Sequence, residues 1–518
     1  MTKPMKKSLK RGQPAQVVLF AGATALMAVG SPAYADSAVD TLLNKLEQKG
    51  ILTAGEADEM KAENAAEHSA EETNLINQLP VSKWKMADSI KSMGFYGDFR
   101  LRYEYRGVDN SPPPPNHLGS WPGTYYRERF RYALRFGLRG DLYDSFSYGI
   151  RLETSNNPRS PWDTFGNNTT GGSVTPSDKN SSGIYLGQAY LNWHPVDWYE
   201  MTAGRMAMPL YTTPMVWDSD INPEGAFEKF KYTMGNVDLF ADFGQFVYQD
   251  PSSASGAPSS DTFLLAWQAG ANVRFAKDMS FKIAPMFYTY EGSGSSGGLN
   301  SIFVGQGGLG SNSGLNIGVP GGSPSYSQEG INDLFILEIP AELNFKIKNT
   351  PLGTLQARLF GDFAYNFKGG DRATAAYYAN PLAFPGMTGP ATGQDIAYQV
   401  GFGLGNAGPV YGPTQGLVYG STSKKNTWEA RVYWQHIEQY ALDVNLIDSD
   451  FFEGRGNLQG LYTAFAYSFT DAIIGAVRYG YANQINGNLG TGGSNLDIPG
   501  LNPIKNYHIL QLDLTWRF

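Results

Sequence analysis

The stretch "NYHILQLDLTWRF", residues 506–518, decides the fold. Counting back from its last residue, every second position is apolar: Phe518, Trp516, Leu514, Leu512 and Leu510. The residues between them are polar, and this period of two predicts a β-strand with one apolar and one polar face. A soluble β-sandwich has such strands too, so the alternation alone does not distinguish a protein core from a lipid bilayer.

The first 35 residues predict export. A basic region from Lys3 to Arg11 precedes an apolar run from Val17 to Val29, and Ala33-Tyr34-Ala35 provides an Ala-x-Ala cleavage site. These are the parts of a secretory signal peptide, residues 1–35. The apolar run is shorter than the roughly 20 residues that a membrane-spanning helix needs, which argues against an anchor.

Composition narrows the class of protein. Removing residues 1–35 leaves 35 basic and 48 acidic residues, and this mature net charge of −13 disfavours nucleic acid as a partner. The chain has no cysteine, which excludes disulfides and thiolate chemistry. No later segment has the length and apolarity of a transmembrane helix, so membrane residence is expected only as a β-barrel. The 31 Tyr and 10 Trp suit a membrane interface.

Residues 36–93 predict a short helical periplasmic segment followed by a linker. Val39, Leu42, Leu43 and Leu46 share one face of a helix, and Gly50 is placed to end it. Thr53-Ala54-Gly55-Glu56 then has the form of a capping box that starts a second helix. This segment is too small for a core of its own and too short for the plug of an active-transport receptor.

From Gly94 to Phe518 the period is two throughout, which predicts an all-β, transmembrane antiparallel β-barrel. Its strands run over about 10 to 14 residues, longer than the 5 or 6 typical of soluble proteins. Short and long connections alternate, as in outer-membrane barrels. We expect about sixteen strands: 94–106, 125–139, 145–155, 184–194, 198–206, 226–234, 236–248, 262–276, 279–290, 332–348, 354–367, 396–405, 426–438, 459–469, 472–483 and 507–518. Eighteen are possible, because the long connection 406–426 falls where a tight turn is expected.

The first strands predict a basic wall in the lumen. Their inward positions carry eight arginines: Arg100, Arg102, Arg106, Arg127, Arg129, Arg131, Arg135 and Arg151. One interpretation is that they pair with Asp98, Glu104 and Glu153 and hold the wall together. The other is that the surplus of positive charge draws anions or carboxylate groups through the pore.

The long connection at residues 208–225, "MPLYTTPMVWDSDINPEG", is the third outer loop by strand parity. Trp217, Asp218, Asp220 and Glu224 are its aromatic and acidic residues. If it folds into the lumen, its acids face the arginine wall and create a transverse field; otherwise it stays at the surface. The Asp218-Ser219-Asp220 spacing is similar to the start of a calcium loop, but Pro223 stands where such loops need Gly, so we expect no metal.

Catalysis has little support in the sequence, and the protein is not expected to be an enzyme or to need a cofactor. The five histidines are far apart, in different predicted elements: His68, His117, His194, His436 and His508. The Gly-rich stretch 292–322 is not followed by a helix, so we interpret it as a flexible extracellular loop rather than a phosphate-binding loop.

Several phrases resemble the putative porin family of Gram-negative outer membranes. They are "LGQAYLNWHPVDWYEMTAGRMAMPLY" with "VWDSDINPEGA", "QYALDVNLIDSDFFEGRGNLQGLYTAFAYSFTD", and the early "LLNKLEQKGILTAGEADEMK". The resemblance implies a channel protein, a homotrimer, and a pore constriction at residues 217–225. By similarity to outer-membrane proteins, Phe518 after a strand containing Trp516 is the signal read by the barrel-assembly machinery.

The sequence therefore predicts an outer-membrane porin, embedded in outer-membrane lipid, through which small hydrophilic solutes diffuse passively. Two alternatives stay open. One is a channel selective for an anion or organic acid, and the other is a structural or adhesive barrel whose long loops bind partners.

Overall fold

A computed structural model of the chain describes residues 89–109, 124–155, 160–166, 183–249, 262–291, 334–379, 387–406, 424–491 and 504–518. The chain divides into two units, Met1–Ala87 and Asp88–Phe518, and all of these residues belong to the second. The predicted signal peptide, the predicted helical segment up to residue 88, the Gly-rich loop and most of the connection 406–426 lie outside the described residues.

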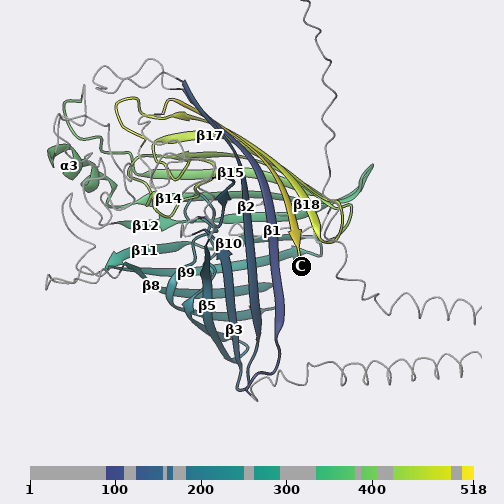
Figure 1. Ribbon diagram of the computed structural model, residues 1–518. Coiled ribbons are helices and arrows are strands. Elements are labelled where there is room, and N and C mark those ends of the chain that lie inside the picture. The colour runs from purple at the N-terminus through teal and green to yellow at the C-terminus, as the bar shows by residue number, and fades with distance from the viewer. Residues whose placement is uncertain are drawn as a thin grey trace, which may run out of the picture. The chain divides into compact units, whose positions relative to one another are not determined.

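The described residues form one large antiparallel sheet with one helix at its margin (Figure 1). The helix is α3 (Gly369–Ala379). The strands are β1 (Gly94–Asp109), β2 (Thr124–Asp141), β3 (Phe146–Thr154), β4 (Asp163–Thr164), β5 (Ile184–Val196), β6 (Tyr199–Arg205), β7 (Glu224–Met234), β8 (Val237–Gln249), β9 (Thr262–Ala276), β10 (Met279–Ile283), β11 (Met286–Glu291), β12 (Phe335–Glu338), β13 (Ala341–Thr350), β14 (Gly353–Asn366), β15 (Ile396–Gly405), β16 (Trp428–Ile437), β17 (Leu458–Ser468), β18 (Ile473–Gln484) and β19 (Asn506–Arg517).

The sheet closes on itself as a barrel. Each wall strand pairs with its neighbour in sequence, and β1 pairs with β19 over twelve register positions, from Asp98 with Arg517 to Asp109 with Asn506. The strands β10 and β11 both pair with β9 and count as one interrupted wall strand; β12 and β13 both pair with β14 and count as another. The two-residue β4 belongs to a loop that pairs with β2. The wall therefore has sixteen strands, as predicted.

Two prolines explain the interrupted strands. Pro285 separates β10 from β11, and Pro340 separates β12 from β13. Proline has no N–H to donate to the ladder, so regular pairing stops at these positions. The two breaks lie side by side, because the backbone N–H of Ala284 donates to the carbonyl of Pro340 at 3.1 Å.

The alternation read from β19 has the expected consequence in the barrel. Leu512, Leu514 and Trp516 are exposed on the outside, while Gln511, Asp513 and Thr515 are buried on the inside. Most of the exposed large apolar side chains of the strands share this outward placement, as a wall in contact with lipid requires.

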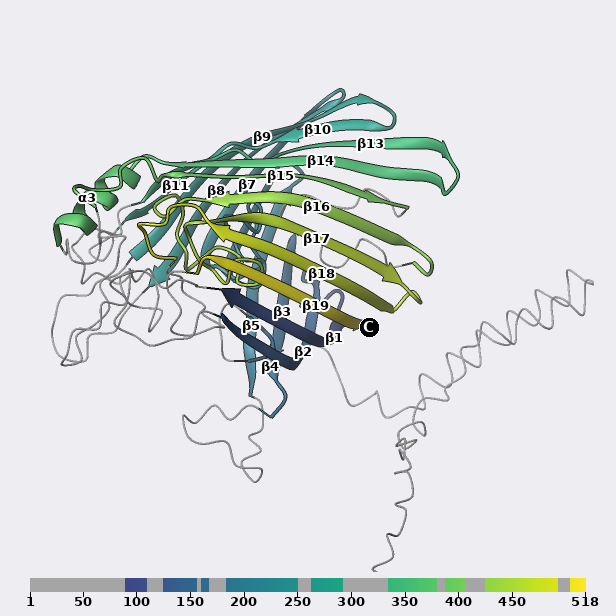
Figure 2. The same ribbon diagram turned by 90° about the horizontal axis from the view of Figure 1, so that it is seen from above.

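The two ends of the barrel differ. Figure 2 shows α3 at one end and the tight β9–β10 and β13–β14 turns at the other. The tight-turn end of β5, β6 and β7 carries an aromatic group in which Trp198, Tyr199 and Phe230 lie within 5.1 to 6.3 Å of one another. Such residues favour a membrane interface. No helix among the described residues is long and apolar enough to span a bilayer.

Candidate functional site

The third outer loop, here residues 206–223, joins β6 to β7 and lies against the inner face of the barrel. Its first half is fixed to one side of the wall. The Thr212 hydroxyl donates to Glu338 Oε1 on β12 at 2.6 Å, and the Thr213 hydroxyl donates to Asp362 on β14. The backbone N–H of Tyr211 donates to Gln268 on β9 at 2.8 Å. These contacts place the loop inside the lumen rather than at the surface.

The second half of the same loop is fixed to other strands. Arg135 on β2 donates to the Asp220 carboxylate. The amide oxygen of Asn222 accepts from Gln188 on β5 at 2.8 Å and from Arg151 on β3 at 3.4 Å. Because its two halves contact β9, β12 and β14 on one side and β2, β3 and β5 on the other, the loop crosses the lumen.

Three of the four residues predicted at the constriction come together in this crossing segment. Trp217 is buried and donates through Nε1 to the carbonyl of Ile221 at 3.0 Å, and the Asp218 carboxylate is also buried. Glu224 is apart from them: it begins β7, is exposed, and pairs with Arg205 at 2.9 Å. Burial disfavours the charged form of Asp220, but Arg135 and Arg100 outweigh it and lower the pKa of this carboxyl.

A second inward loop was not predicted. The seventh outer loop, residues 438–457 between β16 and β17, is almost entirely buried and contributes to the same apolar cluster as the third outer loop. Asp450 accepts two hydrogen bonds from Arg102, at 3.0 and 3.1 Å, and Glu453 lies 3.4 Å from Arg106. The sequence carried a signal for this loop, because Asp448-Ser449-Asp450 repeats the Asp218-Ser219-Asp220 of the third outer loop.

The arginine wall is largely covered and paired. Five of its eight side chains are at most 8% exposed: Arg100, Arg102, Arg106, Arg129 and Arg131. Within the wall, Glu104 lies 3.0 Å from Arg106 and 3.6 Å from Arg131, and also pairs with Arg129. Asp98 pairs with Arg100, and Glu153 lies 2.9 Å from Arg151. The predicted pairing with these three carboxylates is therefore present, and the two inward loops add further carboxylates to it.

Aromatic rings also cover the lumen charges. The guanidinium of Arg102 lies 4.0 Å from the centre of the Trp162 ring, which belongs to the loop after β3. Across the lumen, Lys282 on β10 lies 3.5 Å from the centre of the Tyr211 ring in the third outer loop. Cation–π contacts of this kind hold the charges in place.

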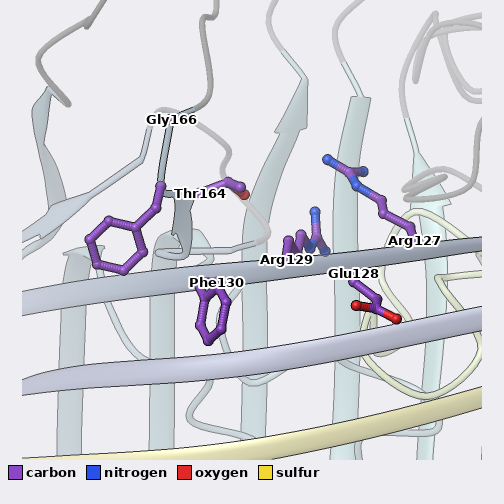
Figure 3. A pocket seen from close by; sticks show the side chains of 7 residues that line it. Arg127, Glu128, Arg129, Phe130, Thr164 and Gly166 are labelled. Carbon is purple, nitrogen blue, oxygen red and sulfur yellow. The ribbon is translucent and has the colours of Figure 1, made fainter. Parts of the chain in front are cut away.

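A cavity of about 350 Å³ lies beside β2 and β4. Figure 3 shows that Arg127 and Arg129 extend to one side of the β2 ribbon and Glu128 and Phe130 to the other, as strand alternation requires. The cavity is near the rim of the wall, where β2 pairs with β4 in place of β3.

The described part of the chain contains no group of three or more His, Asp or Glu side chains that could hold a metal ion. Burial, followed by the neighbouring Asp450, raises the pKa of the Asp448 carboxyl in the seventh outer loop to about 6.

The predicted assembly signal lies at the closing seam of the barrel. Trp516 faces outward on β19, and Phe518 follows that strand. The backbone of Phe518 exchanges hydrogen bonds with Gly97 on β1, at 3.0 and 3.2 Å.

A closed sixteen-stranded barrel with an apolar outer face, a charged lumen and inward-folded loops defines the class of outer-membrane channel barrels. Residues 115–303 match the model of the family described as putative porin. The resemblance read from the sequence is thus confirmed for this part of the chain, which includes the third outer loop.

Three of the solved structures that match this chain have low sequence identity to it. The outer membrane channel DcaP of Acinetobacter baumannii is 14% identical, with 84% of this chain and 99% of that one covered and a TM-score of 0.37. OprB of Pseudomonas putida is 11% identical, with 82% of this chain and 94% of that one covered and a TM-score of 0.43. OmpT of Vibrio cholerae is 10% identical, with 83% of this chain and 100% of that one covered and a TM-score of 0.37. No curated protein sequence matches the chain.

Proposed function

We propose that this protein is an outer-membrane porin through which small hydrophilic solutes diffuse passively. The observation that carries the proposal is a lumen lined by charged side chains and crossed by the third outer loop. Such a lumen admits water and polar solutes, and a fixed loop sets their size limit without any moving part. Nothing in this arrangement requires catalysis.

The pairing of the arginine wall favours general diffusion over selectivity for anions. A strongly anion-selective pore needs positive charge in contact with lumen water, whereas five of the eight wall arginines are buried. In this proposal the constriction consists of Trp217, Asp218 and Asp220, with Asp220 as the lumen charge. Glu224 lies at its edge and contributes to the field from there.

Planar-bilayer recording of the purified full-length protein tests the function. Stepwise conductance increments that scale with bulk salt conductivity are expected for an open water-filled pore. An inserted, folded barrel without conductance would support the adhesive or structural alternative. A reversal potential near the anion limit in a salt gradient would support the anion-selective one.

The export and assembly steps complete the proposal. The signal peptide is cleaved after Ala35, the barrel-assembly machinery inserts the barrel into outer-membrane lipid, and three copies associate. Mass spectrometry of the mature N-terminus tests the cleavage. Unheated gel electrophoresis and cross-linking in detergent test the homotrimer.

A further inference from the structure

The seventh outer loop repeats the turn of the third outer loop. In the third loop, the N–H groups of Val216 and Trp217 both donate to the carbonyl of Thr213, at 3.0 and 2.9 Å. In the seventh, the N–H groups of Leu446 and Ile447 both donate to the carbonyl of Asp443, at 3.0 and 3.4 Å. The same hydrogen-bond pattern therefore recurs at equivalent places, 230 residues apart.

The repeated Asp-Ser-Asp also has the same local geometry in both loops. In each, the first aspartate accepts a hydrogen bond from the backbone N–H of the second. The distance is 2.9 Å from Asp220 N to Asp218 Oδ1 and 3.1 Å from Asp450 N to Asp448 Oδ1. This Asx turn fixes the backbone conformation at the second aspartate of each loop.

The two loops bind each other through these turns. The N–H of Asp218 donates to the carbonyl of Leu446 at 2.6 Å, and the N–H of Asp448 donates to the carbonyl of Pro214 at 2.9 Å. The N–H of Ser449 donates to the Asp218 carboxylate at 3.0 Å. With apolar side chains of both loops in one buried cluster, the loops form a single body inside the lumen.

The second aspartate of each loop lies over arginines of the wall. Asp450 binds Arg102 and lies 3.6 Å from Arg106, as Asp220 binds Arg135. The Asp450 side chain is 29% exposed, whereas those of Arg102 and Arg106 are at most 1% exposed. A solute in the lumen therefore meets the Asp450 carboxylate before the guanidinium groups behind it.

We propose that the seventh outer loop is a second selectivity-determining loop, in which Asp450 screens Arg102 and Arg106 as Asp220 screens Arg135. This inference rests on the proposed channel function. Arg102 keeps its bond to Asp513 and Arg106 keeps its pair with Glu104 when Asp450 is neutralised. Neutralising either aspartate still removes one negative charge from the lumen, and the more positive potential raises the local concentration of anions. The effect is larger at about 0.1 M salt than at 1 M, because the Debye length falls from about 10 Å to about 3 Å.

The test is the reversal potential of the full-length protein in a KCl gradient across a planar bilayer. We expect Asp450→Asn and Asp220→Asn each to raise the chloride-to-potassium permeability ratio severalfold, and the double variant to raise it further. Asp450→Glu keeps the charge and should stay near the unsubstituted protein. Asp371→Asn, which removes an exposed carboxylate from α3, is the matched control and should change nothing.

A second variant tests the same point without relying on the stability of the asparagine forms. The chain has no cysteine, so Asp450→Cys introduces a single thiol. A negatively charged methanethiosulfonate should restore the original selectivity, and a positively charged one should drive it further toward anions. Asp371→Cys, labelled in the same way, is expected to be unresponsive.

The possible failures are distinguishable. If the unsubstituted protein does not conduct, the proposed function is wrong. If it conducts and Asp220→Asn alters selectivity while Asp450→Asn and the labelled Asp450→Cys do not, the channel stands and the inference about the seventh loop is wrong.

Discussion

Glu104 shows how single residues hold the arginine wall together. Its fully buried carboxylate forms ion pairs with Arg106 at 3.0 Å, with Arg131 at 3.6 Å and with Arg129. It also accepts a hydrogen bond from the Gln511 side chain at 3.0 Å. Four guanidinium groups, counting Arg102 at 3.7 Å, thus share one carboxylate. A buried cluster of like charges is stable only while its counter-charge remains.

We therefore predict that Glu104→Gln destabilises the barrel by about 3–5 kcal/mol, the usual effect of removing one partner of a buried ion pair. The measurement is the urea dependence of the folded, fast-migrating gel band. Glu224→Gln is the control, because its pair with Arg205 is exposed and should contribute at most about 1 kcal/mol. Equal unfolding midpoints for the two variants would show that the wall does not depend on Glu104.

Asp448 gives a prediction on pH. Its pKa of about 6 exceeds the ordinary value of 3.8, so the folded protein favours the neutral form of this acid. The contribution of the neutral form to the free energy of unfolding is therefore complete below about pH 4 and is lost as the pH rises through 6. Above that pH a new negative charge stands beside Asp450. We expect the channel to become more cation-preferring between pH 5 and 7, measured as a reversal potential.

Asp448→Asn should flatten that dependence, because the amide oxygen can still accept from the backbone of Asp450 but carries no charge. Sensitivity to pH that is the same with and without the substitution would assign the titration to another group.

The sequence predicted which arginines face the lumen but not what covers them. Period two is enough to place Arg102 and Arg106 on the inner face. Their loop partners Asp450 and Glu453 lie more than 340 residues away, and a loop has no periodicity that indicates its direction. Pairing at this range depends on the closed tertiary structure.

At the scale of elements, the third outer loop depends on two threonine hydroxyls. Thr212 and Thr213 donate to Glu338 and Asp362, two buried carboxyl groups on neighbouring wall strands. Each hydroxyl that is removed leaves a buried carboxyl group with one hydrogen bond fewer, at a cost of about 1–3 kcal/mol. The anchorage of the loop is therefore sensitive to single hydroxyl groups.

We predict that the double variant Thr212→Val with Thr213→Val loosens the first half of the loop. Single-channel recordings should show larger or noisier conductance than the unsubstituted pore. Thr233→Val, which removes a hydroxyl from an exposed pair with Asp238, is the control. Quiet currents of unchanged size in the double variant would mean that the loop is held by its other contacts alone.

The strands were predictable because a membrane wall imposes one rule on all of them. All sixteen were found from period two and connection length. The two interruptions, at Pro285 and Pro340, do not disturb this rule, because alternation resumes on the same wall strand after each break.

The loops follow no such rule. Strand parity identifies the third outer loop, whereas only the repeated Asp-Ser-Asp marks the seventh in the sequence.

At the scale of the whole molecule, closure depends on the seam between β1 and β19. Near the tight-turn end, Phe518 exchanges two backbone hydrogen bonds with Gly97, and its ring lies against that glycine. A Cβ at position 97 would come within 2.6 Å of the ring and 2.4 Å of the Arg135 carbonyl oxygen. The absence of a side chain at Gly97 thus lets the last residue dock on the first strand.

Deleting Phe518 should reduce the amount of folded barrel in the outer membrane, and Phe518→Ala shows which part of the residue is responsible. The alanine variant keeps the backbone hydrogen bonds to Gly97 and loses only the ring. If the ring is the signal read by the assembly machinery, both variants assemble poorly in cells, while Phe518→Ala refolds in detergent as well as the unsubstituted chain. If backbone closure is what matters, only the deletion is impaired, in cells and in detergent alike. Normal assembly of both variants would exclude Phe518 from either role, and the heat-modifiable gel band provides the measurement in each case.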